Sequence, residues 1–132
     1  MASALDSARQ LIEARIESGL SGVSIAWPDR PFAAVDTFVQ PAITWGEGTT
    51  LTLDPTGLNE TVAVLTVNVF TLPGTGDGAG ARLCDTIRDA FADWESGVVR
   101  MGVAEGPIEV RSGSGHYRQR AMSLPFTVLE TT

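Results

Sequence analysis

Lysine is absent from this 132-residue chain, and cysteine and histidine occur once each, as Cys84 and His116. Without lysine, the chain cannot form a Walker A phosphate loop, a Schiff base or any other lysine nucleophile. One cysteine and one histidine allow neither an intramolecular disulfide nor a Cys/His zinc cluster within one chain. The composition therefore excludes several common catalytic and metal-binding designs.

Long apolar runs and an excess of positive charge are also missing. The N-terminal segment MASALDSARQLIEARIESG mixes acidic and basic residues, so we expect neither an export signal nor a membrane span. Sixteen acidic residues against nine basic ones, all of them arginine, give a net charge of −7. This sign disfavours tight binding to nucleic-acid phosphates and to anionic membranes.

The remaining composition is that of a folded protein, with 43% hydrophobic and 19% charged residues. A chain of this length is close to the size at which one hydrophobic core is sufficient. We therefore expect a single domain over residues 1–132. Because the chain has one cysteine and needs no disulfide, it is compatible with a reducing cytoplasm.

Two segments show the spacing of amphipathic helices. Apolar residues recur every three or four positions between Ser3 and Ser18, and Gly19 is placed to end that helix in a left-handed conformation. A second helical pattern runs from Leu83 to Trp94, where Trp94 is expected to be a core residue.

Strand patterns occupy most of the rest. Short strands are expected around residues 23–27, 98–101 and 108–111, and longer ones around 37–45 and 116–129. The segment ETVAVLTVNVFTL, residues 60–72, is apolar on nearly both faces and is predicted to lie at the sheet centre. The glycines and prolines between residues 46 and 60 predict a protruding loop or hairpin. The pattern favours an α+β fold: a two-layer, mostly antiparallel sheet with two helices packed on one face.

The segment GDGAGA, residues 76–81, fits the dinucleotide-binding pattern G-x-G-x-x-G/A. Residues 72–75 separate it from the preceding strand, and Asp77 places a negative charge where a pyrophosphate needs neutral donors. We interpret it as a strand-to-helix connection. A small nucleotide-binding module or enzyme that uses this loop remains the alternative.

Other side chains suggest chemistry only weakly. Three acidic residues recur at four-residue intervals: Asp85, Asp89 and Asp93. We interpret them as a solvated or subunit-facing stripe on a helix. Arg82 and Arg88 are near enough to pair with Asp85. His116 follows two loop serines without the turn of a hydrolase, and Cys84 is predicted to be a buried apolar residue. We therefore expect no catalytic residue, no cofactor and no metal.

The better candidates are residues for contacts between proteins. Tryptophans at strand ends and charged residues in loops and in the last hairpin are typical of subunit contacts. The candidate interface residues are Trp45, Asp54, Glu60, Arg111, Arg118 and Arg120.

Taken in order, four segments resemble the tail terminator-like proteins of long-tailed phages and of gene transfer agents. They are an N-terminal helix, the segment IAWPDRPF, the strand LTVNVFTLPGTG that leads into ARLCDTIRDAF, and the closing strand YRQRAMSLPFTV. Together these segments cover nearly the whole chain. None of them is a catalytic signature, so the likeness rests on their order and spacing.

The resemblance implies a structural virion protein and not an enzyme. Such proteins form a six-membered homo-oligomeric ring that caps the tail-tube protein, ends its polymerisation and offers the opposite face to the head connector or stopper protein. DNA would pass through the lumen without specific binding. The particle would be assembled in the bacterial cytoplasm, with the ring at the head-proximal end of the tail. A related neck or tube subunit and a monomeric adaptor remain alternatives.

Overall fold

The structure is a computed structural model that describes residues 4–20, 22–28, 37–50, 58–72, 77–110 and 118–131. The helices are α1 (Ala4–Gly19) and α2 (Asp77–Phe91). The strands are β1 (Ser24–Ile25), β2 (Thr37–Thr50), β3 (Leu58–Thr71), β4 (Glu95–Ser96), β5 (Val99–Met101), β6 (Glu105–Val110) and β7 (Arg118–Thr131).

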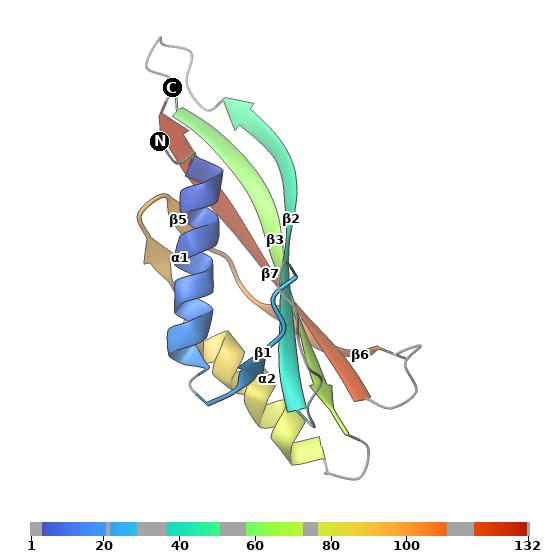
Figure 1. Cartoon of the computed structure of the whole chain (residues 1–132). Helices are drawn as coiled ribbons and strands as arrows, with labels where there is room; N and C mark the ends of the chain where they lie inside the picture. Colours follow the sequence, from blue (N-terminus) through green and yellow to red (C-terminus); the bar gives the residue numbers. More distant parts are fainter. Residues whose placement is uncertain are drawn as a thin grey trace.

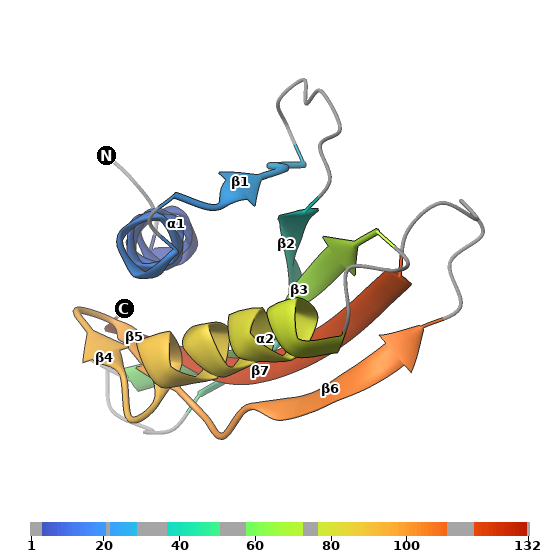
Figure 2. The same ribbon diagram turned by 90° about the horizontal axis from the view of Figure 1, so that it is seen from below.

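The strands form one curved sheet in the order β1-β2-β3-β7-β5-β4, with β6 also paired to β7. Among the described strands, β1 and β2 alone are parallel neighbours, and the other pairs are antiparallel. Both helices lie against the same face of the sheet (Figures 1 and 2), which we call the helix face. The opposite face, which we call the open face, carries no helix in the described part of the chain. The α+β fold with both helices on one face is therefore confirmed.

The core lies between the helices and the three long strands. Alternate residues of β3 and β7 point to the helix face and are buried, and β3 lies between β2 and β7 as its apolar sequence predicted. In α1 the buried residues follow helical spacing. The core residues from the helices and β7 are Ala8, Ile12, Ile16, Cys84, Ile87, Phe91, Met122, Leu124, Phe126 and Val128.

The C-terminal ends of the two helices are in direct contact. A Cβ atom at Gly19 would lie 3.0 Å from the Cβ of Ala90, so glycine allows α1 to approach α2 closely at this point. Beside it, the Arg15 Nε donates a hydrogen bond of 2.6 Å to the Ala90 carbonyl in the last turn of α2. The arginine thereby satisfies a carbonyl that the end of the helix leaves without an intrahelical partner.

Several sequence predictions need correction. Residues 46–60, expected as a protruding loop or hairpin, belong largely to a hairpin: β2 continues to Thr50 past a register shift after Trp45, and Thr50 pairs with Asn59 near the start of β3. The positive φ angle after α1 belongs to Gly22, at 82°, and not to Gly19. The second helix ends at Phe91, so Trp94 lies beyond it, half-buried and edge-on to the Phe91 ring. A two-residue strand, β4, was not predicted.

Candidate protein interface

The outer edge of β2 is largely unpaired within the described residues. β1 pairs with it only at Phe38 and Val39, and no other described strand continues along that edge. The Val39 carbonyl accepts a hydrogen bond from Ala26 at 2.8 Å, which shows that Val39 directs its backbone groups outward. Because backbone direction alternates along a strand, Ile43 and Trp45 also present theirs to this edge. Pro41 has the same orientation but presents only its carbonyl, since proline has no backbone N–H. The remaining backbone donors and acceptors are a template for pairing with another strand.

A shallow apolar hollow of about 440 Å³ lies beside this edge, and we call it the sheet hollow. Strands β2, β3, β5 and β7 contribute to it, together with Gly102, which follows β5. The side chains that reach it from the open face include Val62, 47% exposed, and Val64. Arg100 stands at its border and forms an exposed ion pair of 3.0 Å with Glu95. The lining is thus apolar, with one cation at the border.

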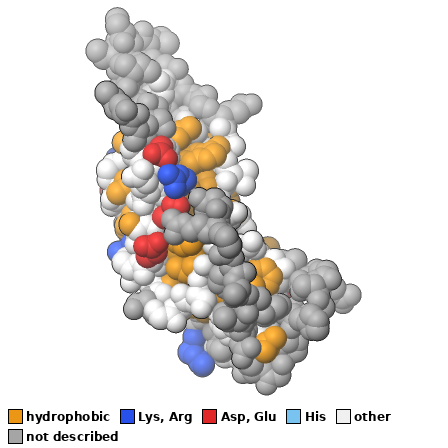
Figure 3. Space-filling view, viewed as in Figure 1, with side chains coloured by type: hydrophobic (Ala, Val, Ile, Leu, Met, Phe, Trp, Pro, Cys, Tyr) orange, Lys and Arg blue, Asp and Glu red, His pale blue; other side chains and the backbone are white. Residues whose placement is uncertain are grey.

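A second hollow, of about 320 Å³, lies between α1 and β2, and we call it the helix hollow. Its apolar lining comes from four segments: α1, the turn after β1, β2 and, through Leu65, β3. The contributing residues include Ile12, Ile16, Trp27, Pro28, Pro41 and Ile43. In the space-filling view, a row of red and blue side chains borders orange hydrophobic ones on this face of the molecule (Figure 3).

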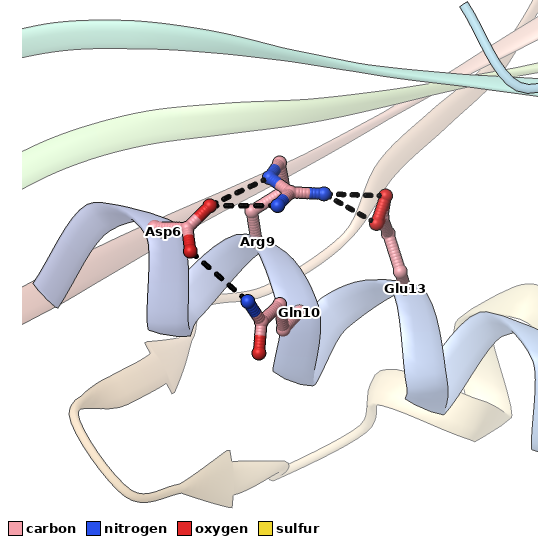
Figure 4. A network of polar contacts seen from close by, with 4 residues as sticks. All are labelled: Asp6, Arg9, Gln10 and Glu13. Carbon is pink, nitrogen blue, oxygen red and sulfur yellow. Dashed lines mark hydrogen bonds and ion pairs between the residues drawn. The ribbon is translucent and has the colours of Figure 1, made fainter. Parts of the chain in front are cut away.

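The polar border of the helix hollow is an ion-pair network on α1 (Figure 4). The Arg9 guanidinium contacts Asp6 at 2.6 Å and Glu13 at 2.9 Å, and Gln10 donates to the other Asp6 oxygen at 3.0 Å. The hydrogen bond that Arg9 donates to Asp6 and the charge of Glu13 raise the pKa of Arg9. Arg9 and Glu13 line the hollow itself, so the apolar cleft has one charge of each sign at its margin.

Trp45 connects the two hollows. Its ring packs edge-on against Phe126, with centroids 5.8 Å apart and planes at 77°, and its atoms line both hollows. The side chain remains 37% exposed. Trp45 was predicted as an interface residue, and the structure places it at a partly exposed position of β2 beside both hollows. Its role in binding stays a prediction.

The other predicted interface residues do not gather at that edge. Asp54 and Arg111 lie outside the described residues. Glu60 is half-buried on β3 opposite Leu129. Arg118 and Arg120 lie at the far end of the sheet, since Arg118 is opposite Thr71 while Trp45 is opposite Ala63 on the same strand. Arg118 forms an ion pair of 2.6 Å with Glu109 of β6.

The glycine-rich segment has a structural use at Gly80. Residues 73–76 lie outside the described part of the chain, and α2 begins at Asp77. Gly80 is buried, and a Cβ atom there would overlap the Arg120 guanidinium. The absence of a side chain at Gly80 thus leaves room for Arg120 beside the helix backbone.

The remaining candidates for chemistry are separated. Cys84 is 1% exposed, as predicted, and burial raises the pKa of its thiol. Asp85 and Asp89 lie on the exposed side of α2, but Asp93 follows the helix with a φ of 53°, so the predicted stripe of three is wrong at its last member. Arg88, expected near Asp85, donates to the Gly106 carbonyl. His116 and its neighbouring serines lie outside the described residues, and no metal-ligand group of three acidic, cysteine or histidine residues occurs within the described ones.

Sequence reasoning missed the two hollows and the open edge. A signal was present: the segment TFVQPAITWG, residues 37–46, contains no charged residue in a chain with net charge −7. Edge strands that must stay unpaired are commonly protected by charge.

No described helix is long and apolar enough to cross a membrane.

Comparison with known proteins supports the fold. No protein-family profile matches the sequence, and no curated protein is significantly similar to it. One solved structure, whose name states no function, is 18% identical and has a TM-score of 0.63 over 91% of this chain and 94% of the other. Identity at this level establishes a shared fold. It carries no information about activity.

Proposed function

We propose that the chain is a structural subunit of a ring, with six members as the resemblance implies, that caps the tail tube of a phage or gene transfer agent particle. One observation carries this proposal: the outer edge of β2, uncharged from Thr37 to Gly46, lies between two apolar hollows that meet at Trp45. Aromatic residues in apolar surroundings with a polar border are typical of protein interfaces. Such a surface supports assembly with other protein subunits.

The charge of the chain suits a ring through which DNA passes. A net charge of −7 gives no general attraction for phosphates, so DNA in the lumen would move without being held. The tail-tube protein would contact one side of the ring and the head connector or stopper protein the other. The particle would carry the protein at the head-proximal end of its tail.

Native mass spectrometry of purified protein tests the ring. We expect a species of six subunits of 13.9 kDa each. Trp45→Glu should abolish it by placing a charge between the two hollows, while the folded circular dichroism spectrum is kept because Trp45 is partly exposed. The matched control is Ala92→Glu, which adds the same charge at an exposed position just beyond α2.

The proposal would be contradicted if the purely monomeric protein, added to tails assembled without this chain, also failed to join them to heads. It would favour a monomeric adaptor. A ring that joins no heads but co-polymerises with tube protein would instead indicate a related neck or tube subunit.

A further inference from the structure

The sheet has a second outer edge, formed by β6. This strand pairs on one side with β7, and no described strand lies on its other side (Figure 2). β6 is therefore at the opposite side of the sheet from β2. One copy of the chain thus presents two sheet edges that its own described strands leave open.

The side chains of β6 are sorted by face. Ile108 lies opposite Ala121, on the open face, and is 67% exposed. Glu109 lies opposite Arg120, on the helix face, where it pairs with Arg118. Glu105 and Glu109 are the only charged residues of this strand. Glu105 lies opposite Ser123, on the open face. β6 thus offers an exposed apolar side chain and a carboxylate on the open face, and a second carboxylate on the helix face.

The surroundings of the β2 edge are complementary to this pattern. The sheet hollow on the open face is apolar with Arg100 at its border, and the helix hollow on the helix face has the Arg9–Glu13 ion pair at its margin. A strand added to an existing edge gains main-chain hydrogen bonds and directs alternate side chains to the two faces. A continued sheet keeps the same face outward, so Ile108 would be directed to the sheet hollow and Glu109 to the margin of the helix hollow.

We propose that the outer edge of β6 in one copy of the chain pairs with the outer edge of β2 in the next copy. The inference rests on the ring of the proposed function and names the surfaces that join its subunits. The Glu109–Arg118 pair of one copy meets the Arg9–Glu13 pair of the next, so that each arginine faces a carboxylate of the other copy. This contact is heterologous, as a closed ring of identical subunits requires.

The two edges are open at different heights of the sheet. β6 lies opposite residues 119–123 of β7, which pair with residues 66–70 of β3. The open part of β2 begins at Gln40 and pairs with residues 59–68 of β3, most of which precede residue 66. Joining them staggers each subunit along the strand direction relative to its neighbour. A closed sheet has this kind of stagger, because its strands are tilted to the ring axis.

Cysteine crosslinking of the purified protein tests the pairing. Thr44→Cys on β2 and Ile108→Cys on β6 both place a thiol at an exposed position of the open face. A short bismaleimide added to the double variant should give a ladder of covalent multimers that ends at the ring. Each single variant should give at most traces, since a β2 thiol then meets no β6 thiol. The parent chain, whose only thiol is the buried Cys84, is the reagent control.

Three results would overturn the inference. Efficient crosslinking of Thr44→Cys alone would show that two β2 edges pair with each other. A ring in native mass spectrometry without a ladder from the double variant would show that subunits join through another surface, and would leave the proposed function standing. A protein that stays monomeric at every concentration would remove the interface itself. The proposed function is tested separately, and it fails if tails have normal length in a strain that lacks this chain.

Discussion

The guanidinium of Arg120 lies against the backbone of Gly80, in the space that a Cβ atom at residue 80 would occupy. Arg120 comes from β7 and Gly80 from the first turn of α2, so this contact fixes how the start of the helix sits on the sheet. The positive charge of Arg120 also acts on Cys84, one turn further along the helix, but burial outweighs it in setting the pKa of the thiol.

This contact predicts non-additive effects of two substitutions. In an Arg120→Ala background, Gly80→Ala should stabilise the protein by ~1 kcal/mol through helix propensity. In the parent chain the same change should gain less or be destabilising, because the new methyl group displaces the guanidinium. The coupling energy should reach at least ~0.5 kcal/mol in urea unfolding. Additive effects would show that Arg120 does not occupy this position.

The contact between the helix ends predicts a stability role for Arg15. Removing its bond to the Ala90 carbonyl by Arg15→Ala should lower the free energy of unfolding by about 1.5–3 kcal/mol, as for hydrogen bonds from charged groups. Arg100→Ala is the control, since its ion pair with Glu95 is exposed and should contribute under ~1 kcal/mol. Equal losses in the two variants would contradict this account of the helix junction.

The buried thiol predicts a stability loss at alkaline pH. Burial raises the pKa of Cys84 in the folded protein, whereas the thiol of the unfolded chain ionises at about 8.5. Above that pH the unfolded state loses its proton first, so the folded state becomes less stable relative to it as pH rises. Urea unfolding from about pH 7 to pH 10 should show a steeper decline for the parent chain than for Cys84→Ala. Parallel curves would mean that the thiol ionises equally in both states.

The glycine-rich segment predicts no response to nucleotides. Because Arg120 fills the space beside Gly80, we expect millimolar nucleotide to leave the Tm unchanged. Differential scanning fluorimetry with adenine and guanine nucleotides measures this directly. A rise of several degrees would show preferential binding to the folded state, and would support the nucleotide-binding alternative.

Much of the fold could be predicted from the sequence because the periodicities are strong. The apolar spacing of α1, the β-branched run of β3 and the burial of Cys84 each follow from local patterns. Boundaries were less accurate. The glycine content of residues 46–48 alone suggests a loop. β2 nevertheless continues past Gly46 and Gly48, because a register shift accommodates these residues in the pairing with β3.

The candidate site was predictable only at Trp45. The helix hollow combines α1, the turn at Pro28, the edge of β2 and Leu65 of β3, and no sequence pattern indicates that these four segments meet. The contact of Arg120 with Gly80 depends on the register between β7 and α2. Conversely, the uncharged stretch of β2 was visible in the sequence, but its meaning depends on knowing that the strand lies at an edge.

Tail length in a strain that lacks this chain tests the central claim most directly. If the protein caps a growing tube, its loss leaves an open heterologous interface that continues to add subunits. Electron micrographs should then show overlong tails that are not attached to filled heads, and the parent chain should restore both length and joining while Trp45→Glu should not. Tails of normal length joined to heads in the deletion strain would contradict the terminator function.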